Sequence, residues 1–192
     1  MTLSLHDQPG KAALAVRGDD LYETPACAVE ALLRCEKLPE TIWEPACGPG
    51  AIVRVLRGAG HKVYATDLVE YGLEDAESRV DFLMESHPSF QLGAIVTNPP
   101  FKLADQFVRH ALTLCPRVIM LLRLAFLESE RRTGILDSGL LARVHVFRNR
   151  LPMMHRASYS RTSRQGSSAI PFAWFVWEWG HTGPATLNRI SW

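Results

Sequence analysis

The sequence has few cysteines and no long uncharged apolar segment. The four cysteines among its 192 residues are scattered, with no CxxC pair, so they indicate neither a zinc site nor a disulfide framework. No segment approaches the roughly 18–20 uncharged apolar residues of a membrane helix, and residues 1–11 are polar, unlike a signal peptide. We therefore expect a cytoplasmic protein with no bound metal, and the length suits a single globular domain.

Acidic residues are scarce between positions 131 and 169. That segment contains eight arginines and a single acidic residue, Asp137, whereas residues 1–130 contain 12 Lys+Arg and 18 Asp+Glu. A basic block beside an acidic domain is typical of a segment that binds a polyanion. The alternative is an arginine-rich face that contacts solvent and no partner.

Apolar periodicity predicts helices that alternate with short strands. The expected helices lie at 25–36, 51–59 and 103–114, with another beginning within 125–134 and weak helical character at 70–78. The expected strands lie at 41–44, 61–67, 92–97, 117–122, 140–147 and 170–179, with a short extended piece at 80–83. Thr24 is expected to be the N-cap of the first helix and Pro25 its first residue.

The order of these elements predicts the fold class. A strand, a glycine-rich turn, a helix and a second strand over residues 41–67 form a βαβ unit, which implies a parallel sheet. We predict one α/β domain over residues 1–192, with helices on both faces of a mostly parallel sheet and ligands at its carboxyl edge. Residues 1–19 are expected to lie loosely on the surface, and residues 149–168 to form a basic mobile loop.

The motif Asn98-Pro99-Pro100-Phe101 follows the apolar strand at 92–97. Neither proline can extend that strand, because each lacks a backbone N–H and has φ fixed at about −65°. The strand must therefore end at Asn98 and present a stiff turn at the carboxyl edge. The Asn98 amide and the flat ring of Phe101 suit a planar substrate that carries an amino group. The alternative is an ordinary Asn-Pro turn.

A second motif, Glu-Pro-Ala-Cys-Gly-Pro-Gly at residues 44–50, follows directly on the strand at 41–44. It is neither the GxGxxG of a dinucleotide site nor a P-loop, because no phosphate-binding lysine follows it. Such a turn suits a cofactor with a carboxylate and a ribose but no pyrophosphate. Asp67, at the next strand end, could accept hydrogen bonds from the ribose hydroxyls, and Asp81, beside Phe82, from an adenine amino group. For each acid the alternative is an exposed loop carboxylate.

The motifs follow one another in a characteristic order. Tyr22-Glu23-Thr24-Pro25, the 44–50 turn, Asp67, Asp81-Phe82 and Asn98-Pro99-Pro100-Phe101 together resemble the S-adenosylmethionine-dependent amino-methyltransferases. Over roughly residues 20–180 the sequence is most similar to DNA adenine-N6 methyltransferases, particularly small phage and prophage ones. The segment Leu122–Glu128 is also similar to the phage-type proteins. Relatives with this motif modify adenine in DNA or RNA, guanine N2 in ribosomal RNA, or a glutamine amide in protein.

The resemblance implies a class I, Rossmann-like methyltransferase fold with a late antiparallel strand near 170–179, and S-adenosylmethionine as cofactor. By position, Asn98, Pro99 and Pro100 would form the reaction centre, and Phe101 would stack on the target base. A further set of residues would bind the cofactor, with different members at its methionine end, its ribose and its adenine. That set is Tyr22, Thr24, Pro25, Glu44, Pro45, Ala46, Cys47, Gly48, Gly50, Asp67, Leu68, Asp81, Phe82 and Asn98, with Glu44 expected to accept from the ammonium group.

Many sequence-specific relatives carry a separate recognition domain, for which this chain has no room. We expect recognition by the loops 128–138 and 149–168, and hence short or weak sequence specificity for DNA, with RNA also open. The side chains expected to contact phosphates, which position a duplex without reading its sequence, are Lys102, Arg131, Arg132, Arg148, Arg150, Arg156, Arg161 and Arg164. Two rival interpretations remain: an RNA or protein-amide methyltransferase, and a degenerate methyltransferase fold that only binds nucleic acid.

Overall fold

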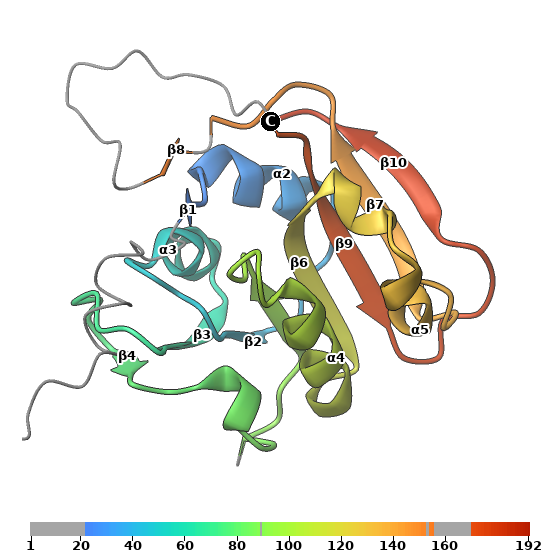
Figure 1. The fold of residues 1–192 in the computed structure, drawn as a ribbon. Helices are drawn as coiled ribbons and strands as arrows, with labels where there is room; N and C mark the ends of the chain where they lie inside the picture. The colour runs from blue at the N-terminus through green and yellow to red at the C-terminus, as the bar shows by residue number, and fades with distance from the viewer. Residues whose placement is uncertain (1–21, 89, 153, 156–169) are drawn as a thin grey trace, which may run out of the picture.

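The computed structural model describes residues 22–88, 90–152, 154–155 and 170–192, and its centre is one eight-stranded sheet (Figure 1). The predicted loose N-terminal residues and most of the predicted mobile loop lie outside the described residues. The strands of the sheet are β2 (Thr41–Glu44), β3 (Lys62–Asp67), β4 (Ala76–Ser78), β5 (Ala94–Thr97), β6 (Arg117–Arg123), β7 (Leu141–Phe147), β9 (Phe172–Glu178) and β10 (Thr186–Ile190). A separate antiparallel pair joins β1 (Tyr22–Glu23) to β8 (Met154–His155).

The strand order of the sheet is β10-β7-β9-β6-β5-β2-β3-β4. β9 runs antiparallel to its two neighbours, β6 and β7, and the other neighbouring pairs are parallel. The carboxyl ends of the parallel strands therefore meet at one edge, where β9 begins. This arrangement confirms the predicted mostly parallel sheet and the late antiparallel strand.

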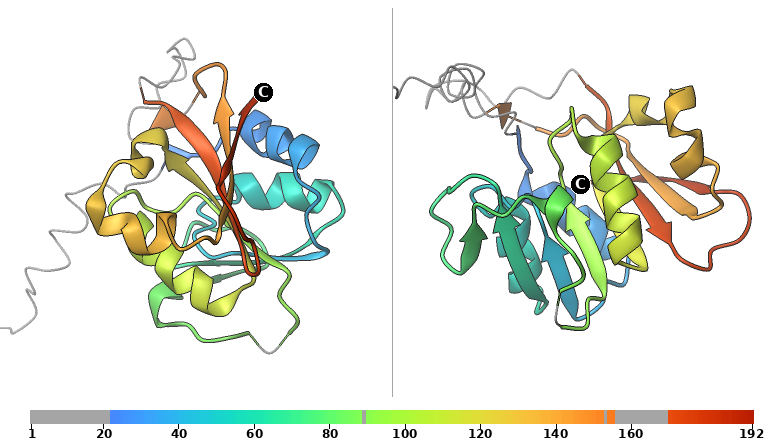
Figure 2. Two further views of the ribbon diagram at one scale, coloured as in Figure 1. Left: turned by 90° about the vertical axis from the view of Figure 1, so that its right-hand side faces the viewer. Right: turned by 60° about the horizontal axis from the view of Figure 1, so that its bottom comes forward.

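Helices cover both faces of the sheet (Figure 2). α2 (Ala26–Cys35) packs against α3 (Ala51–Gly58) on one face, and α4 (Ala104–Leu114) covers the other. Because successive side chains of a strand point to opposite faces, Val96 packs on the α2 side and Ile95 on the α4 side, and both are fully buried. The short helices are η1 (Phe82–Met84), η2 (Leu124–Leu127), η3 (Glu130–Arg132) and α5 (Thr133–Leu136).

The prediction for the start of the first helix is wrong. α2 begins at Ala26 with Pro25 as its N-cap, and no side chain caps it. The Thr24 hydroxyl accepts a hydrogen bond from the Asn98 side chain instead, at 3.0 Å. The Thr24 hydroxyl, which the local pattern assigned to the end of the helix, is therefore used in a contact with a residue far away in the sequence.

Four further elements differ from the sequence pattern. Residues 70–78 contain strand β4 in place of a helix, because residues 76–78 pair with the parallel neighbour β3. Residues 80–83 contain the start of the 3-10 helix η1 in place of an extended piece, and the predicted helix within 125–134 is divided among η2, η3 and α5. Strand β10 was not predicted. Its side chains are exposed or only partly buried, so it lacks the apolar run that reveals a central strand.

An ionic cluster joins α2 to the opposite edge of the sheet, where the parallel strands begin. Glu36, 6% exposed, accepts hydrogen bonds from Arg117, from Arg143 at 2.5 and 3.0 Å, and from His145 at 2.6 Å. Burial alone would raise the pKa of Glu36, but the bonds from His145 and Arg143 lower it to about 2. Burial alone would lower the pKa of His145, but interactions with Cys35 and Glu36 raise it to about 9. At neutral pH the cluster is a carboxylate surrounded by cations.

Within the part of the chain that the structure describes, no helix has both the length and the apolar composition needed to cross a membrane.

Candidate active site

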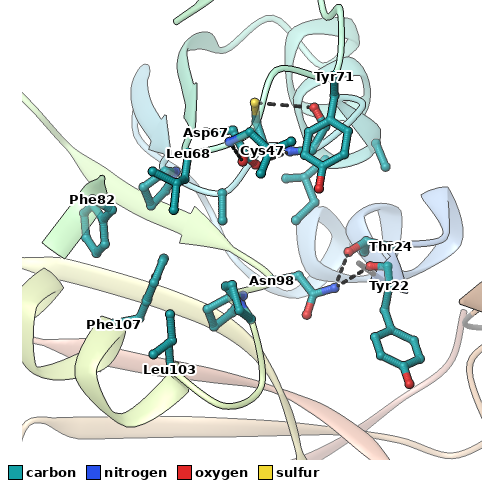
Figure 3. Close-up of a pocket in the computed structure, with 18 of the residues that line it drawn as sticks. Tyr22, Thr24, Cys47, Asp67, Leu68, Tyr71, Phe82, Asn98, Leu103 and Phe107 are labelled. Carbon is teal, nitrogen blue, oxygen red and sulfur yellow. Dashed lines mark hydrogen bonds between the residues drawn. The ribbon is translucent and has the colours of Figure 1, made fainter. Parts of the chain in front are cut away.

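A pocket of about 320 Å³ opens at the carboxyl edge of the sheet, beside the ends of β3 and β5 (Figure 3). This volume lies near the lower end of the range for sites that bind small molecules. The structure brings most of the predicted site residues together there. Those that line the pocket are Tyr22, Thr24, Pro45, Ala46, Cys47, Gly48, Asp67, Leu68, Asp81, Phe82, Asn98, Pro99, Pro100, Phe101 and Lys102.

The side-chain amide of Asn98 is oriented by the segment that precedes α2. Its Nδ2 donates to the Tyr22 carbonyl oxygen at 2.9 Å and to Thr24 Oγ1 at 3.0 Å. A carbonyl oxygen only accepts, so the amide must turn its nitrogen toward Tyr22 and its oxygen away. Asn98 Oδ1 is buried and has no hydrogen-bond partner among the described residues. Asn98 therefore contributes to the pocket wall a fixed side chain whose oxygen lacks a donor among the described residues (Figure 3).

Asp67 and two glycines shape the turn between β2 and α3. Gly48 and Gly50 have positive φ angles of 51° and 90°, which favour glycine. Asp67 Oδ2 accepts from the Gly48 N–H and its Oδ1 from the Val69 N–H, each at 2.8 Å. The predicted contact of Asp67 with the ribose stays a prediction. Asp67 also holds the turn in place, a role that the sequence did not reveal.

Three of the predicted cofactor residues are not in the pocket wall: Pro25, Glu44 and Gly50. Pro25 and Gly50 are the N-caps of α2 and α3. Glu44 is fully buried behind the wall, where its Oε1 accepts from the Ala46 N–H at 3.2 Å. Burial raises the pKa of Glu44 to about 8, an effect that the Thr97 hydroxyl only partly opposes. A raised pKa favours the protonated form of Glu44 in the ligand-free protein. Its predicted contact with an ammonium group stays a prediction.

Cys47 contributes a neutral thiol to the pocket. Its side chain is 7% exposed, and burial together with the nearby acids Glu44 and Asp67 raises its pKa to about 12. The thiolate is the nucleophilic form of cysteine. At neutral pH Cys47 is therefore suited to packing and not to covalent catalysis.

An apolar wall lies across the pocket from the turn (Figure 3). Phe82 is 2% exposed, and its ring centroid lies 4.9 Å from that of Phe107 on α4. Asp81 Oδ1 accepts from the Leu83 N–H at 3.1 Å and so caps η1. Leu68, 60% exposed, lies at the rim. This wall suits a flat heterocycle.

The Phe101 ring is held by three neighbours. Its centroid lies 4.9 Å from that of Tyr22 and 5.6 Å from that of Phe172, at the start of β9. The guanidinium carbon of Arg123, at the end of β6, lies 4.2 Å from the Phe101 centroid. A cation–π contact therefore already occupies the ring on which a base is predicted to stack.

Comparison with known proteins is informative at the level of structure. No protein-family model matches the chain, and no curated protein matches it in sequence. A candidate RNA methyltransferase from Pyrococcus horikoshii superimposes with a TM-score of 0.61 at 14% identity, over 91% of this chain and 98% of the other. The chain has the class I methyltransferase fold.

Two further solved structures share the methyltransferase fold. The modification subunit of a candidate type I restriction enzyme from Vibrio vulnificus YJ016 gives a TM-score of 0.58 at 15% identity, over 93% of this chain and 48% of the subunit. A dimethyladenosine transferase from Plasmodium falciparum gives 0.52 at 14% identity, over 82% of this chain and 62% of the transferase. At identities this low, the superpositions establish the fold alone, and they confirm the predicted fold class.

The predicted phosphate-binding side chains are dispersed over the methyltransferase fold. Lys102 lines the pocket and Arg131 is exposed. Arg132 Nη1 donates to the carbonyl oxygens of Phe126 and Glu128, each at 3.0 Å, and its guanidinium lies over the Phe126 ring. Arg132 therefore stabilises the η2–η3 turn, and its predicted phosphate contact stays a prediction. Arg148 and Arg150 are exposed beyond β7, while Arg156, Arg161 and Arg164 lie outside the described residues.

Sequence reasoning missed several residues of the pocket wall outside the quoted motifs: Ala51, Ile52, Val69, Tyr71, Val80, Leu103 and Phe107. Most of them are adjacent in sequence to a predicted residue, so the motifs themselves could have indicated them. Phe107 is different, because apolar periodicity showed only that it faces inward. Its position opposite the turn follows from how α4 packs on the sheet.

Proposed function

We propose that this protein transfers the methyl group of S-adenosylmethionine to the exocyclic N6 amino group of adenine in DNA. The observation that carries the proposal is the buried Asn98 Oδ1, which has no partner among the described residues and is held in place by two hydrogen bonds from the nitrogen of the same amide. Buried polar groups are rarely left without a partner in native structures. An amino group of the substrate would satisfy this one.

The turn that contains Asn98 also suits the chemistry of an aromatic amine. The exocyclic nitrogen of adenine is a poor nucleophile, because its lone pair is delocalised into the ring. Acceptance of its two N–H groups by Asn98 Oδ1 and the Pro99 carbonyl would draw the nitrogen toward tetrahedral geometry. The positive charge that develops there would be stabilised by dipoles already in place. Orientation of the two reactants would supply much of the remaining acceleration.

The pocket residues suit S-adenosylmethionine, which supplies an electrophilic methyl group when it is bound. Gly48 lines the pocket and has no Cβ, so a ligand can approach its backbone closely. We assign Asp67 to the ribose, and Asp81 with Phe82 to the adenine. We assign the methionine end of the cofactor to residues of two segments. Tyr22 and Thr24 accept hydrogen bonds from Asn98, and Pro45, Ala46 and Cys47 follow β2.

A nucleic acid as substrate is supported by two observations. Proteins of the same fold include a candidate RNA methyltransferase, a dimethyladenosine transferase and the modification subunit of a restriction enzyme. The chain also concentrates eight arginines within residues 131–169. The choice of DNA rests on the resemblance of the ordered motifs to DNA adenine methyltransferases. A base in a duplex must be flipped, at a cost of a few kcal/mol.

The test uses methyl-labelled S-adenosylmethionine with unmethylated DNA, ribosomal RNA and a protein extract in parallel, followed by digestion and mass identification of the modified residue. We expect N6-methyladenine in DNA. Label in RNA or in glutamine would keep the pocket chemistry but overturn the proposed substrate. Absence of cofactor binding would favour a degenerate module that only binds nucleic acid.

A further inference from the structure

A second pocket, of about 250 Å³, opens beyond the end of β7 at the same edge of the sheet as the first. Its wall consists of Phe147, Arg148, Asn149, Arg150, Pro171 and Phe172. Two arginines and an asparagine, all exposed, line it beside apolar residues. Guanidinium groups recognise phosphate oxygens through paired hydrogen bonds. The composition therefore matches a nucleotide better than an uncharged ligand.

The charge of the carboxyl edge changes sign along the sheet. On the side of the first pocket, β3 ends in Asp67 and η1 is preceded by Asp81. On the other side, β6 ends in Arg123, and Arg148 and Arg150 follow β7. An edge that is acidic at one pocket and basic at the other separates a site for a cationic cofactor from a site for a polyanion.

Aromatic contacts connect the two pockets. Phe172, 4% exposed, lines the second pocket and lies 5.6 Å from Phe101 of the first, measured between ring centroids. Arg123 pairs with Phe172 in the sheet and places its guanidinium over Phe101. Its Nε is buried and has no partner within the described residues. The wall between the pockets thus contains one cation and a donor that is still to be satisfied.

We propose that the second pocket binds the nucleotide next to the target base, with Arg148 and Arg150 on the phosphodiester that links the two. The proposal rests on the proposed function, because it takes the first pocket as the site of the target base. The strand would pass over the Phe101–Phe172 wall, where the positive charge of Arg123 would attract the same backbone. The pocket assigns a position to one particular phosphate, which a diffuse basic surface would not.

The test measures binding affinity while the arginines of the protein and single phosphates of the oligonucleotide are altered separately and together. The probe is a labelled oligonucleotide around the adenine that methylation mapping identifies, with one phosphate at a time replaced by an uncharged methylphosphonate. In the unaltered protein, replacement of one phosphate beside the target should weaken binding about tenfold. In the double variant Arg148→Ala/Arg150→Ala the same replacement should have no further effect, and the slope of log K against log salt should fall by about 0.9 per lost contact.

The control variant is Lys62→Ala, which removes a positive charge from an exposed side chain at the opposite edge of the sheet. It should leave the salt slope and every phosphate effect unchanged, and the arginine variants should retain their affinity for S-adenosylmethionine. Equal methylphosphonate effects in the unaltered protein and the double variant would overturn the second pocket while leaving methylation intact. Failure of the unaltered protein to methylate any nucleic acid would instead overturn the proposed function.

Discussion

Asn98 has an amide nitrogen with two acceptors and an oxygen with none among the described residues. Such an arrangement costs stability, because a buried acceptor without a donor loses its hydrogen bond to water. It is also what a binding site needs, since the oxygen requires no reorganisation when a donor arrives. The orientation of the Asn98 amide, which Tyr22 and Thr24 set, thus connects the N-terminal segment to the proposed reaction.

Replacement of Asn98 by alanine should reduce the rate of methyl transfer by about 10²–10³, the effect of removing one preorganised hydrogen-bonding group from a reaction centre. Thr24→Val should give a smaller loss, because the Tyr22 carbonyl still orients the amide. Single-turnover rates and cofactor affinity by calorimetry would be measured for both. An Asn98→Ala protein that turns over at the normal rate would remove Asn98 from the mechanism.

Burial of Glu44 predicts a dependence of stability on pH. Its pKa is raised from 4.5 to about 8, so the folded protein binds a proton that the unfolded chain releases at lower pH. Its contribution is complete below pH 4.5 and is lost as the pH rises toward 8, on the order of 1 kcal/mol per pH unit. Glu44→Gln retains the shape of the side chain and should show a flatter profile than the wild type in urea denaturation at pH 5 to 8. Parallel profiles would show that Glu44 does not titrate in this range.

At the scale of the element, the N-terminus of α3 depends on Gly50. Its φ of 90° is strained for any other residue, and an added Cβ would lie 2.6 Å from the Leu73 side chain. Gly48, two residues earlier, lines the pocket, and its N–H donates to Asp67 Oδ2. Displacement of the start of α3 should therefore affect both stability and cofactor binding.

Gly50→Ala should destabilise the protein by about 1–3 kcal/mol and weaken cofactor binding. The matched control is Gly58→Ala at the other end of α3, where an added Cβ would meet no atom within 4 Å. That change should stabilise the protein by about 0.5–1 kcal/mol, because alanine loses less backbone entropy in a helix, and should leave cofactor affinity unaltered. Urea denaturation and calorimetric titration distinguish the two; equal effects at both positions would contradict the role given to Gly50.

At the scale of the whole molecule, the two edges of the sheet serve different purposes. The carboxyl edge contains both pockets, whereas the opposite edge contains the cluster around Glu36, which connects α2 to β6 and β7. Glu178, at the end of β9, joins the same cluster through Arg143 at 2.6 Å. The cluster therefore stabilises the fold from a position remote from the proposed chemistry.

Glu36→Gln should destabilise the protein by about 3 kcal/mol, since it removes the buried counter-charge of His145 and leaves Arg117 and Arg143 with only the partly exposed Glu178. The carboxylate contribution should also vanish from the wild type as the pH falls from 4.5 toward 2, and the His145 contribution as the pH rises from 6.5 through 9. Glu40→Gln, which breaks an exposed pair with Lys62, is the control and should change stability little. Methylation per folded molecule should be the same in all three proteins; a selective loss in Glu36→Gln would contradict a purely structural role.

The sequence by itself determined the features that depend on local chemistry. Pro99 and Pro100 cannot continue a strand, so Asn98 had to lie at the carboxyl edge. Strands that are apolar on both faces had to be covered on both faces of the sheet. The tertiary structure alone decided which groups meet across long separations. Asn98 is oriented by residues 74 and 76 positions away, and Arg123 lies over Phe101. It also decided that the pKa of Glu44 is raised, because a pKa depends on burial and on the surrounding dielectric, which no local pattern contains.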